Sequence, residues 1–151
     1  MFTKILIASD GSEGAHRAAQ AGAEIARRFS AQVTVLHVFS PPQVLASYGA
    51  GIPAEMVSGA VDPALIEQWA QSAGQAVAER TQDALRDAGV SYTFRQEIGH
   101  PADRIVRVAE HEKCDLIVIG SRGLSGVKEF LLGSVSSRVS HHAPCAVLIV
   151  H

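Results

Sequence analysis

Short apolar runs alternate with stretches of helical periodicity along the whole chain, and this alternation limits the possible folds more than any other feature. Apolar, β-branched runs predict strands at residues 4–9, 32–39, 91–97, 116–120 and 146–150. Helical spacing predicts the helices between them, at about 11–29, 63–88, 101–111 and 134–142. Strands that alternate with helices form parallel sheets, because each right-handed crossover lays a helix on one face. We therefore expect residues 1–151 to form a single-domain α/β fold, a five-stranded parallel sheet with helices on both faces.

The longest helix is expected to begin at Asp62-Pro63, which are a capping residue and a first-turn proline in their usual order. Gly89 is expected to end it. Trp69 lies on this helix, and we expect it in the core.

Residues 40–61 are rich in glycine, proline and alanine and have no sustained period. We interpret them as a long mobile loop, a kind of segment that often serves as a lid or contact surface. Within it, Gly49-Ala-Gly51-Ile-Pro-Ala54 matches the dinucleotide pattern Gly-x-Gly-x-x-Ala by letter. Because the match follows a loop and contains a proline, we interpret it as a coincidence.

The composition argues against several classes of protein. Nucleic-acid binding usually needs a basic face, and the net charge of −2 argues against one. No apolar run approaches the roughly 20 residues that span a bilayer, and the N-terminus does not look like a signal peptide. Cys114 and Cys145 adjoin strands, where free thiols pack as small hydrophobes. His111 and Cys114 are three residues apart, but no second pair of ligands has zinc spacing. These features favour a cytoplasmic location.

A glycine motif, Gly120-Ser121-Arg122-Gly123 followed after nine residues by Gly133-Ser134, connects the fourth strand to the last helix. Glycines at the end of a strand let backbone amides approach a ligand without a Cβ in the way. Ser134 adds a hydroxyl at a helix start, where unpaired amides and the helix dipole favour an anion. The motif therefore predicts a phosphate-binding loop, with Arg122 or Lys128 to offset charge.

Two alternatives to a phosphate-binding loop of this kind are a P-loop and a glycine-rich turn that binds nothing. A P-loop is excluded, because no glycine here is followed by lysine in the required frame. A glycine-rich turn without a ligand, in which Ser134 is an ordinary N-cap, stays open.

Asp10 also has two interpretations. Asp10-Gly-Ser-Glu13 has the form of a capping box, with Asp10 as N-cap and Glu13 as its partner. Asp10 also follows the first strand directly, where its carboxylate could face a ligand. The two roles are compatible, because one carboxylate oxygen can cap while the other faces the ligand.

Asp10 after the first strand, together with Gly120-x2-Gly123-x9-Gly133-Ser134, resembles the universal stress protein family over the whole chain. The resemblance implies a Rossmann-like sheet of the adenine nucleotide alpha hydrolase-like kind, with strand order 3-2-1-4-5. That order has a topological switch between the first and fourth strands, where ligands bind in open α/β sheets. It further implies binding of ATP or a related adenine nucleotide (ADP or AMP) with Mg²⁺, and a regulatory or signalling role in the stress response.

Carried over position by position, the resemblance implies a set of site residues. The backbone at Ala8 and Val38 would hold adenine, and Asp10 would accept a ribose hydroxyl or help to order Mg²⁺. The phosphates would be wrapped by the two arms of the glycine motif, with the hydroxyls of Ser134 and Ser136 as donors; the arms comprise Gly120, Ser121, Arg122, Gly123 and Gly126 on one side and Gly133, Ser134, Val135 and Ser136 on the other. No catalytic residue is assigned.

The family also implies a homodimer that pairs through the final strand, residues 146–150. Two other functions stay open: a slow Mg-dependent ATPase or nucleotidyl transferase that uses Asp10, and a dimeric interaction scaffold that binds no nucleotide.

Overall fold

The computed structural model describes residues 1–41, 62–123 and 132–151. The predicted loop at 40–61, apart from its first two residues, and the Gly49–Ala54 match lie outside the described residues, as do Gly126 and Lys128. Within the described ranges no helix is long and apolar enough to cross a membrane.

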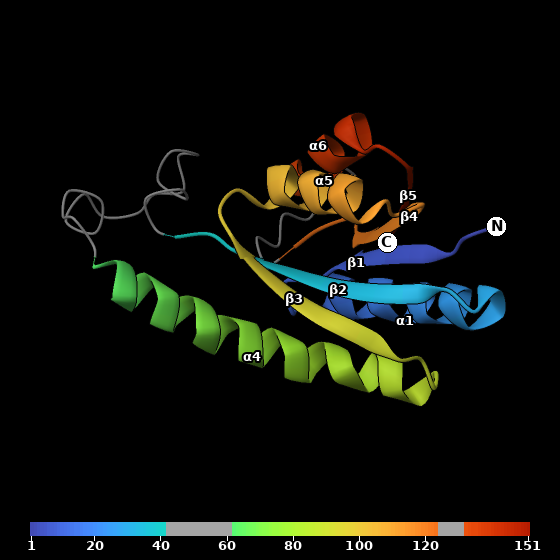
Figure 1. The fold of residues 1–151 in the computed structure, drawn as a ribbon, viewed down its shortest axis with the longest axis horizontal. Helices are drawn as coiled ribbons and strands as arrows, with labels where there is room; N and C mark the ends of the chain where they lie inside the picture. Colours follow the sequence, from blue (N-terminus) through green and yellow to red (C-terminus); the bar gives the residue numbers. More distant parts are fainter. Residues whose placement is uncertain (42–61, 124–131) are drawn as a thin grey trace.

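The predicted α/β fold is confirmed (Figure 1). Five parallel strands form one sheet in the order β3-β2-β1-β4-β5. The strands are β1 (Lys4–Ala8), β2 (Gln32–Phe39), β3 (Tyr92–Ile98), β4 (Leu116–Gly120) and β5 (Ala146–Val150). The helices are α1 (Glu13–Phe29), α4 (Pro63–Asp87), α5 (Pro101–Glu112) and α6 (Ser134–His142).

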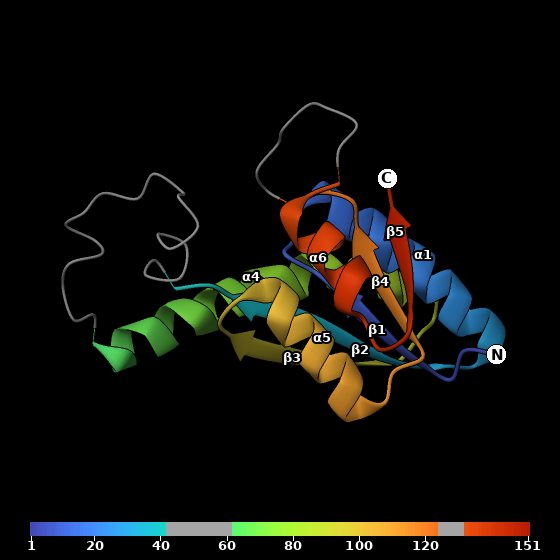
Figure 2. The same ribbon diagram turned by 90° about the horizontal axis from the view of Figure 1, so that it is seen from above.

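Within the described ranges, α1 and α4 cover one face of the sheet, and α5 and α6 cover the other (Figures 1 and 2). Alternation along β1 shows why: Ile5 and Ile7 join the core beneath α1 and α4, while Leu6 and Ala8 join the core beneath α5 and α6. All five residues of β4 are buried. Central parallel strands are covered on both sides and are therefore apolar throughout, whereas the edge strands β3 and β5 are only half-buried.

Small side chains let α1 approach the sheet closely. Ala18, Ala19 and Ala23 are fully buried, and a Cβ on Gly22 would lie 2.7 Å from Cδ1 of Ile7. The buried stripe of α1 runs from Ala15 to Ala26 and does not reach the end of the helix. There Phe29 is 42% exposed and makes an edge-to-face contact with Phe2.

The expected N-cap Asp62 and the end near Gly89 are confirmed for α4, but the expectation that Trp69 is a core residue is wrong. Trp69 is 40% exposed. The buried stripe of α4 consists of small residues instead, and a Cβ on Gly74 would lie 2.6 Å from Oε1 of Gln96 on β3. Because this helix touches the sheet so closely, an indole has no room on the inner face.

Candidate functional site

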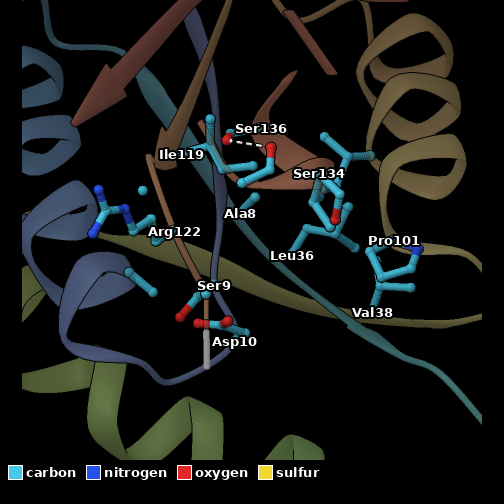
Figure 3. Close-up of a pocket in the computed structure, with 16 residues that line it drawn as sticks. Ala8, Ser9, Asp10, Leu36, Val38, Pro101, Ile119, Arg122, Ser134 and Ser136 are labelled. Atoms are coloured by element: carbon cyan, nitrogen blue, oxygen red, sulfur yellow. Dashed lines mark hydrogen bonds between the residues drawn. The ribbon is translucent and has the colours of Figure 1, made fainter. Parts of the chain in front are cut away.

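A cavity of about 290 Å³ lies at the carboxyl ends of β1 and β4, at the point where the strand order switches (Figure 3). Ten of the twelve predicted site residues line it: Ala8, Asp10, Val38, Gly120, Arg122, Gly123, Gly133, Ser134, Val135 and Ser136. Of the other two, Ser121 is not among the lining residues, and Gly126 lies outside the described residues. The sequence analysis missed six further lining residues: Ser9, Ala15, Leu36, Pro101, Ile105 and Ile119.

The cavity has an apolar side and a polar side. Figure 3 shows Leu36, Val38 and Pro101 on one side, across the cavity from Asp10 and Arg122. Such a combination of apolar walls and a few polar groups is typical of small-molecule sites. The apolar residues follow from the fold, since the ends of parallel strands and the first turn of α5 meet at this edge.

Three glycines allow the chain segments on the polar side to touch. A Cβ on Gly120 would lie 2.8 Å from the carbonyl carbon of Gly14, and a Cβ on Gly14 would lie 2.8 Å from the carbonyl oxygen of Arg122. A Cβ on Gly123 would lie 2.5 Å from Oδ2 of Asp10. The end of β4 and the residues that follow it therefore pack directly against the first turn of α1 and against Asp10. Gly14 belongs to this contact, although the glycine motif does not include it.

The backbone of Ser121 makes three hydrogen bonds, while its contact with a phosphate stays a prediction. Its amide donates to the carbonyl oxygen of Val150 at 2.7 Å, and its own carbonyl accepts from the amide of Gly133 at 2.8 Å and from Oγ of Ser136 at 2.9 Å. Ser121 thus joins the two arms of the glycine motif to each other and to the end of β5. The hydroxyl of Ser136 donates within the motif, and its donation to a phosphate stays a prediction.

The start of α6 presents backbone donors to the cavity. Its N-cap is Gly133, with no side-chain cap, so the interpretation of Ser134 as an ordinary N-cap is wrong. The first intrahelical hydrogen bond runs from the amide of Ser137 to the carbonyl of Gly133. The amides of Ser134, Val135 and Ser136 precede it and have no partner within the helix. Together with the helix dipole they favour an anion here.

Asp10 is not the N-cap of α1, and the capping box is wrong. A turn with Gly11 at φ +76° delays the helix to Glu13, and Ser12 caps it by accepting from the amide of Ala15 at 3.2 Å. Oδ1 of Asp10 accepts from the amide of Ser12 at 2.9 Å, while Oδ2 is the oxygen nearest Gly123. Oδ1 therefore holds the turn, and Oδ2 lies on the side of Gly123, which also lines the cavity.

His37 lies beneath this turn, on the face of the sheet that α1 and α4 cover, and is 7% exposed. Its Nδ1 donates to the carbonyl oxygen of Ser9 at 3.1 Å, since a carbonyl can only accept. Its Nε2 is buried and has no hydrogen-bond partner among the described residues. Burial lowers the pKa of His37, although the bond to Ser9 and the charge of Asp10 oppose the shift.

We expect the stability of the protein to fall in mild acid because of His37. Below pH 6.5 the unfolded chain takes up a proton at this imidazole while the folded protein does not. The free energy of unfolding therefore decreases as the pH falls from about 6.5 to the lower pKa of His37 in the folded protein. The slope from one group is at most about 1.4 kcal/mol per pH unit. Urea denaturation of wild type and His37→Asn between pH 7.5 and 5 measures it. Asn keeps a donor for Ser9, so the wild type should lose more stability than the variant, and parallel curves would contradict the assignment.

Comparisons with known proteins agree with the fold and with the family that the sequence resembles. A family model described as the universal stress protein family matches residues 1–151. Universal stress protein YxiE of Bacillus subtilis is 35% identical, with 99% of each chain covered. Universal stress protein MJ0531 of Methanocaldococcus jannaschii is 36% identical, with 99% of this chain and 82% of the relative covered. A solved universal stress protein in complex with cAMP is 25% identical and has a TM-score of 0.68, with 99% of this chain and 97% of that chain covered. From its glycine motif, its sheet order and these full-length matches, this chain belongs to the universal stress protein family.

Proposed function

We propose that the cavity binds an adenine nucleotide, with the base on the apolar side and the phosphates at the start of α6. The observation that carries this proposal is that one cavity joins an apolar wall to a glycine-lined loop and to the free amides of a helix N-terminus. The similar structure in complex with cAMP supports an adenine nucleotide as the ligand class.

The base would lie against Leu36, Val38 and Ile105, which supply apolar surface from β2 and α5. Ala8 and Val38 are at or near the ends of their strands, where backbone groups leave the sheet ladder. We assign to these backbone groups the recognition of the edge of the base.

The phosphates would bind the amides of Ser134 and Val135 and the backbone at Gly123, with Arg122, which also lines the cavity, to offset charge. Gly126 and Lys128, in the loop between the arms, stay predicted contributors. Ser134 lines the cavity and is exposed, and its hydroxyl makes no hydrogen bond to another described residue, whereas the hydroxyl of Ser136 is bonded within the motif.

Mg²⁺ fits this site as a companion of the nucleotide. The described residues contain no group of three or more side chains that could hold a metal. Mg²⁺ needs only one or two carboxylates when phosphate oxygens and waters complete its shell. Asp10 lines the cavity and is the carboxylate that would take this place, by direct or water-mediated contact.

We further propose that the protein is a cytoplasmic nucleotide-binding module that signals in the stress response as a homodimer. β5 is an apolar strand at one edge of the sheet. An open edge of this kind is a template for pairing with another chain. Pairing of two copies through Ala146–Val150 about a two-fold axis would cover it.

Calorimetric titration with ATP, ADP and AMP, with and without Mg²⁺, tests the proposed ligand. We expect saturable binding with the highest affinity for Mg-ATP, and a loss of about three- to tenfold in Ser134→Ala, which removes one hydrogen bond to a charged group. Ser140→Ala is the matched control. Ser140 is an exposed serine on the same helix, its hydroxyl donates to the carbonyl oxygen of Ser137, and it does not line the cavity. Absence of heat and of a thermal shift at millimolar nucleotide would refute the proposal.

A further inference from the structure

A chain of buried hydrogen bonds joins the turn that carries Asp10 to α4. Thr81 on α4 is 2% exposed and donates its hydroxyl hydrogen to the carbonyl oxygen of Val77 at 2.8 Å. The Oγ atoms of Thr81 and Ser9 are 2.9 Å apart. Because the one hydroxyl hydrogen of Thr81 is already donated, Ser9 must donate to Thr81 in this pair.

The same serine holds the turn. Oγ of Ser9 accepts from the amide of Gly11 at 3.3 Å, and the carbonyl of Ser9 accepts from Nδ1 of His37. Asp10 lies between Ser9 and Gly11 and accepts from the amide of Ser12 through Oδ1. Figure 3 shows the side chains of Ser9 and Asp10 next to each other, with α4 in green below them. The orientation of the Asp10 carboxylate therefore depends on a serine whose own rotamer is set by a residue 72 positions away in the sequence.

We propose that Thr81, through its hydrogen bond with Ser9, is a positioning residue for Asp10. Each donor in the series has one acceptor, so the series runs in one direction, from Gly11 through Ser9 and Thr81 to Val77. Without the Thr81 hydroxyl, Oγ of Ser9 loses its acceptor at a site where Ser9 is only 6% exposed. It then rotates to find another, and the bond from Gly11 is lost with that rotation.

This inference rests on the proposed function, because the carboxylate that Thr81 orients is the one assigned to the ribose or Mg²⁺ of a bound nucleotide. It adds a residue outside the cavity, on a helix that contributes no residue to the lining. It also explains why a threonine occupies the buried stripe of α4, where the other buried residues are alanine, glycine, valine and leucine.

Thr81→Val tests the inference, since valine keeps the shape of threonine and removes the hydroxyl. We expect a folded protein whose affinity for Mg-ATP is lower by about three- to tenfold, and recovery of most of this loss in Thr81→Ser. In an Asp10→Ala background, Thr81→Val should cause no further loss, because the carboxylate it positions is gone. Equal losses in both backgrounds would mean a general structural effect and would overturn the inference, as would an unchanged affinity.

A second measurement does not depend on any nucleotide. In the ligand-free protein, hydrogen exchange followed by NMR should be faster by about fivefold or more at the amides of Gly11 and Ser12 in Thr81→Val. Thr34→Val is the matched control, because it removes a threonine hydroxyl bond, to Glu112, at the other end of the sheet. Unchanged exchange at both amides would overturn the positioning role. Faster exchange in a protein that binds no nucleotide would refute the proposed function alone.

Discussion

Gly120→Ala is expected to lower the free energy of unfolding by about 2–3 kcal/mol, which corresponds to a fall in melting temperature of about 5–10 °C. The added Cβ would lie 2.8 Å from the carbonyl carbon of Gly14 and 3.2 Å from the amide nitrogen of Ala15. Both are backbone atoms in the first turn of α1, so no side-chain rotation relieves the contact. The end of β4 and α1 must move apart, and the polar side of the cavity opens with them. Nucleotide affinity should therefore fall at least about tenfold.

Gly89→Ala separates this effect from the general cost of replacing a glycine. Gly89 has φ +66° and no atom within 4 Å of the added Cβ, so its replacement costs about 1 kcal/mol of backbone strain and nothing in packing. Thermal denaturation and calorimetry of both variants should show a smaller loss of stability in Gly89→Ala, with nucleotide affinity unchanged. If Gly120→Ala is as stable as wild type, the close approach of β4 to α1 is wrong.

Val147→Pro is expected to convert the proposed dimer into a monomer. The carbonyl of Val150 accepts from Ser121, which follows β4. Because residues of a parallel strand point alternately to its two neighbours, Val150 and Leu148 face β4, while Val147 directs its amide to the open edge. Proline at Val147 therefore removes a donor needed by a second copy and leaves the ladder with β4 intact. Light scattering should change from about twice the protomer mass of 16.0 kDa to that mass.

Leu148→Pro is the control for this prediction. Leu148→Pro removes a backbone donor to β4 and should lower the free energy of unfolding by about 3 kcal/mol. Val147→Pro should instead have the melting temperature of a folded, ligand-free monomer. A wild-type protein with the mass of one protomer, or a Val147→Pro variant that remains dimeric, would show that β5 does not form the interface.

The parallel sheet could be predicted from the alternation of apolar runs and helical stretches, whereas its strand order, and with it the place of the cavity, was implied by the family resemblance. Alternating apolar runs determine a parallel sheet, and the switch between β1 and β4 determines where its ligand site lies. The glycine motif was informative because Gly120 and Gly133 are needed where backbone meets backbone, and Gly123 where the backbone meets the carboxylate of Asp10. That requirement can be seen in the sequence because no other residue meets it.

The errors concern which partner a polar or aromatic group finds. Asp10 and Ser12 are both good N-caps, and the choice between them depends on the positive φ of Gly11, which the sequence pattern does not specify. Trp69 has helical spacing compatible with either side of the stripe, and its exposure follows from the close contact between Gly74 and Gln96 across two elements. Both depend on local geometry or tertiary contacts that the sequence pattern does not specify.

The hydrogen bonds of Ser121 have a thermodynamic consequence. The backbone of one residue, Ser121, is bonded through its carbonyl to the second arm of the glycine motif and through its amide to the last residue of β5. If a bound nucleotide and a second copy each order this residue, then reciprocity requires both affinities to change by one and the same factor. Saturation with nucleotide would then lower the dissociation constant of the dimer. A higher protein concentration, which favours the dimer, would raise the affinity for the nucleotide.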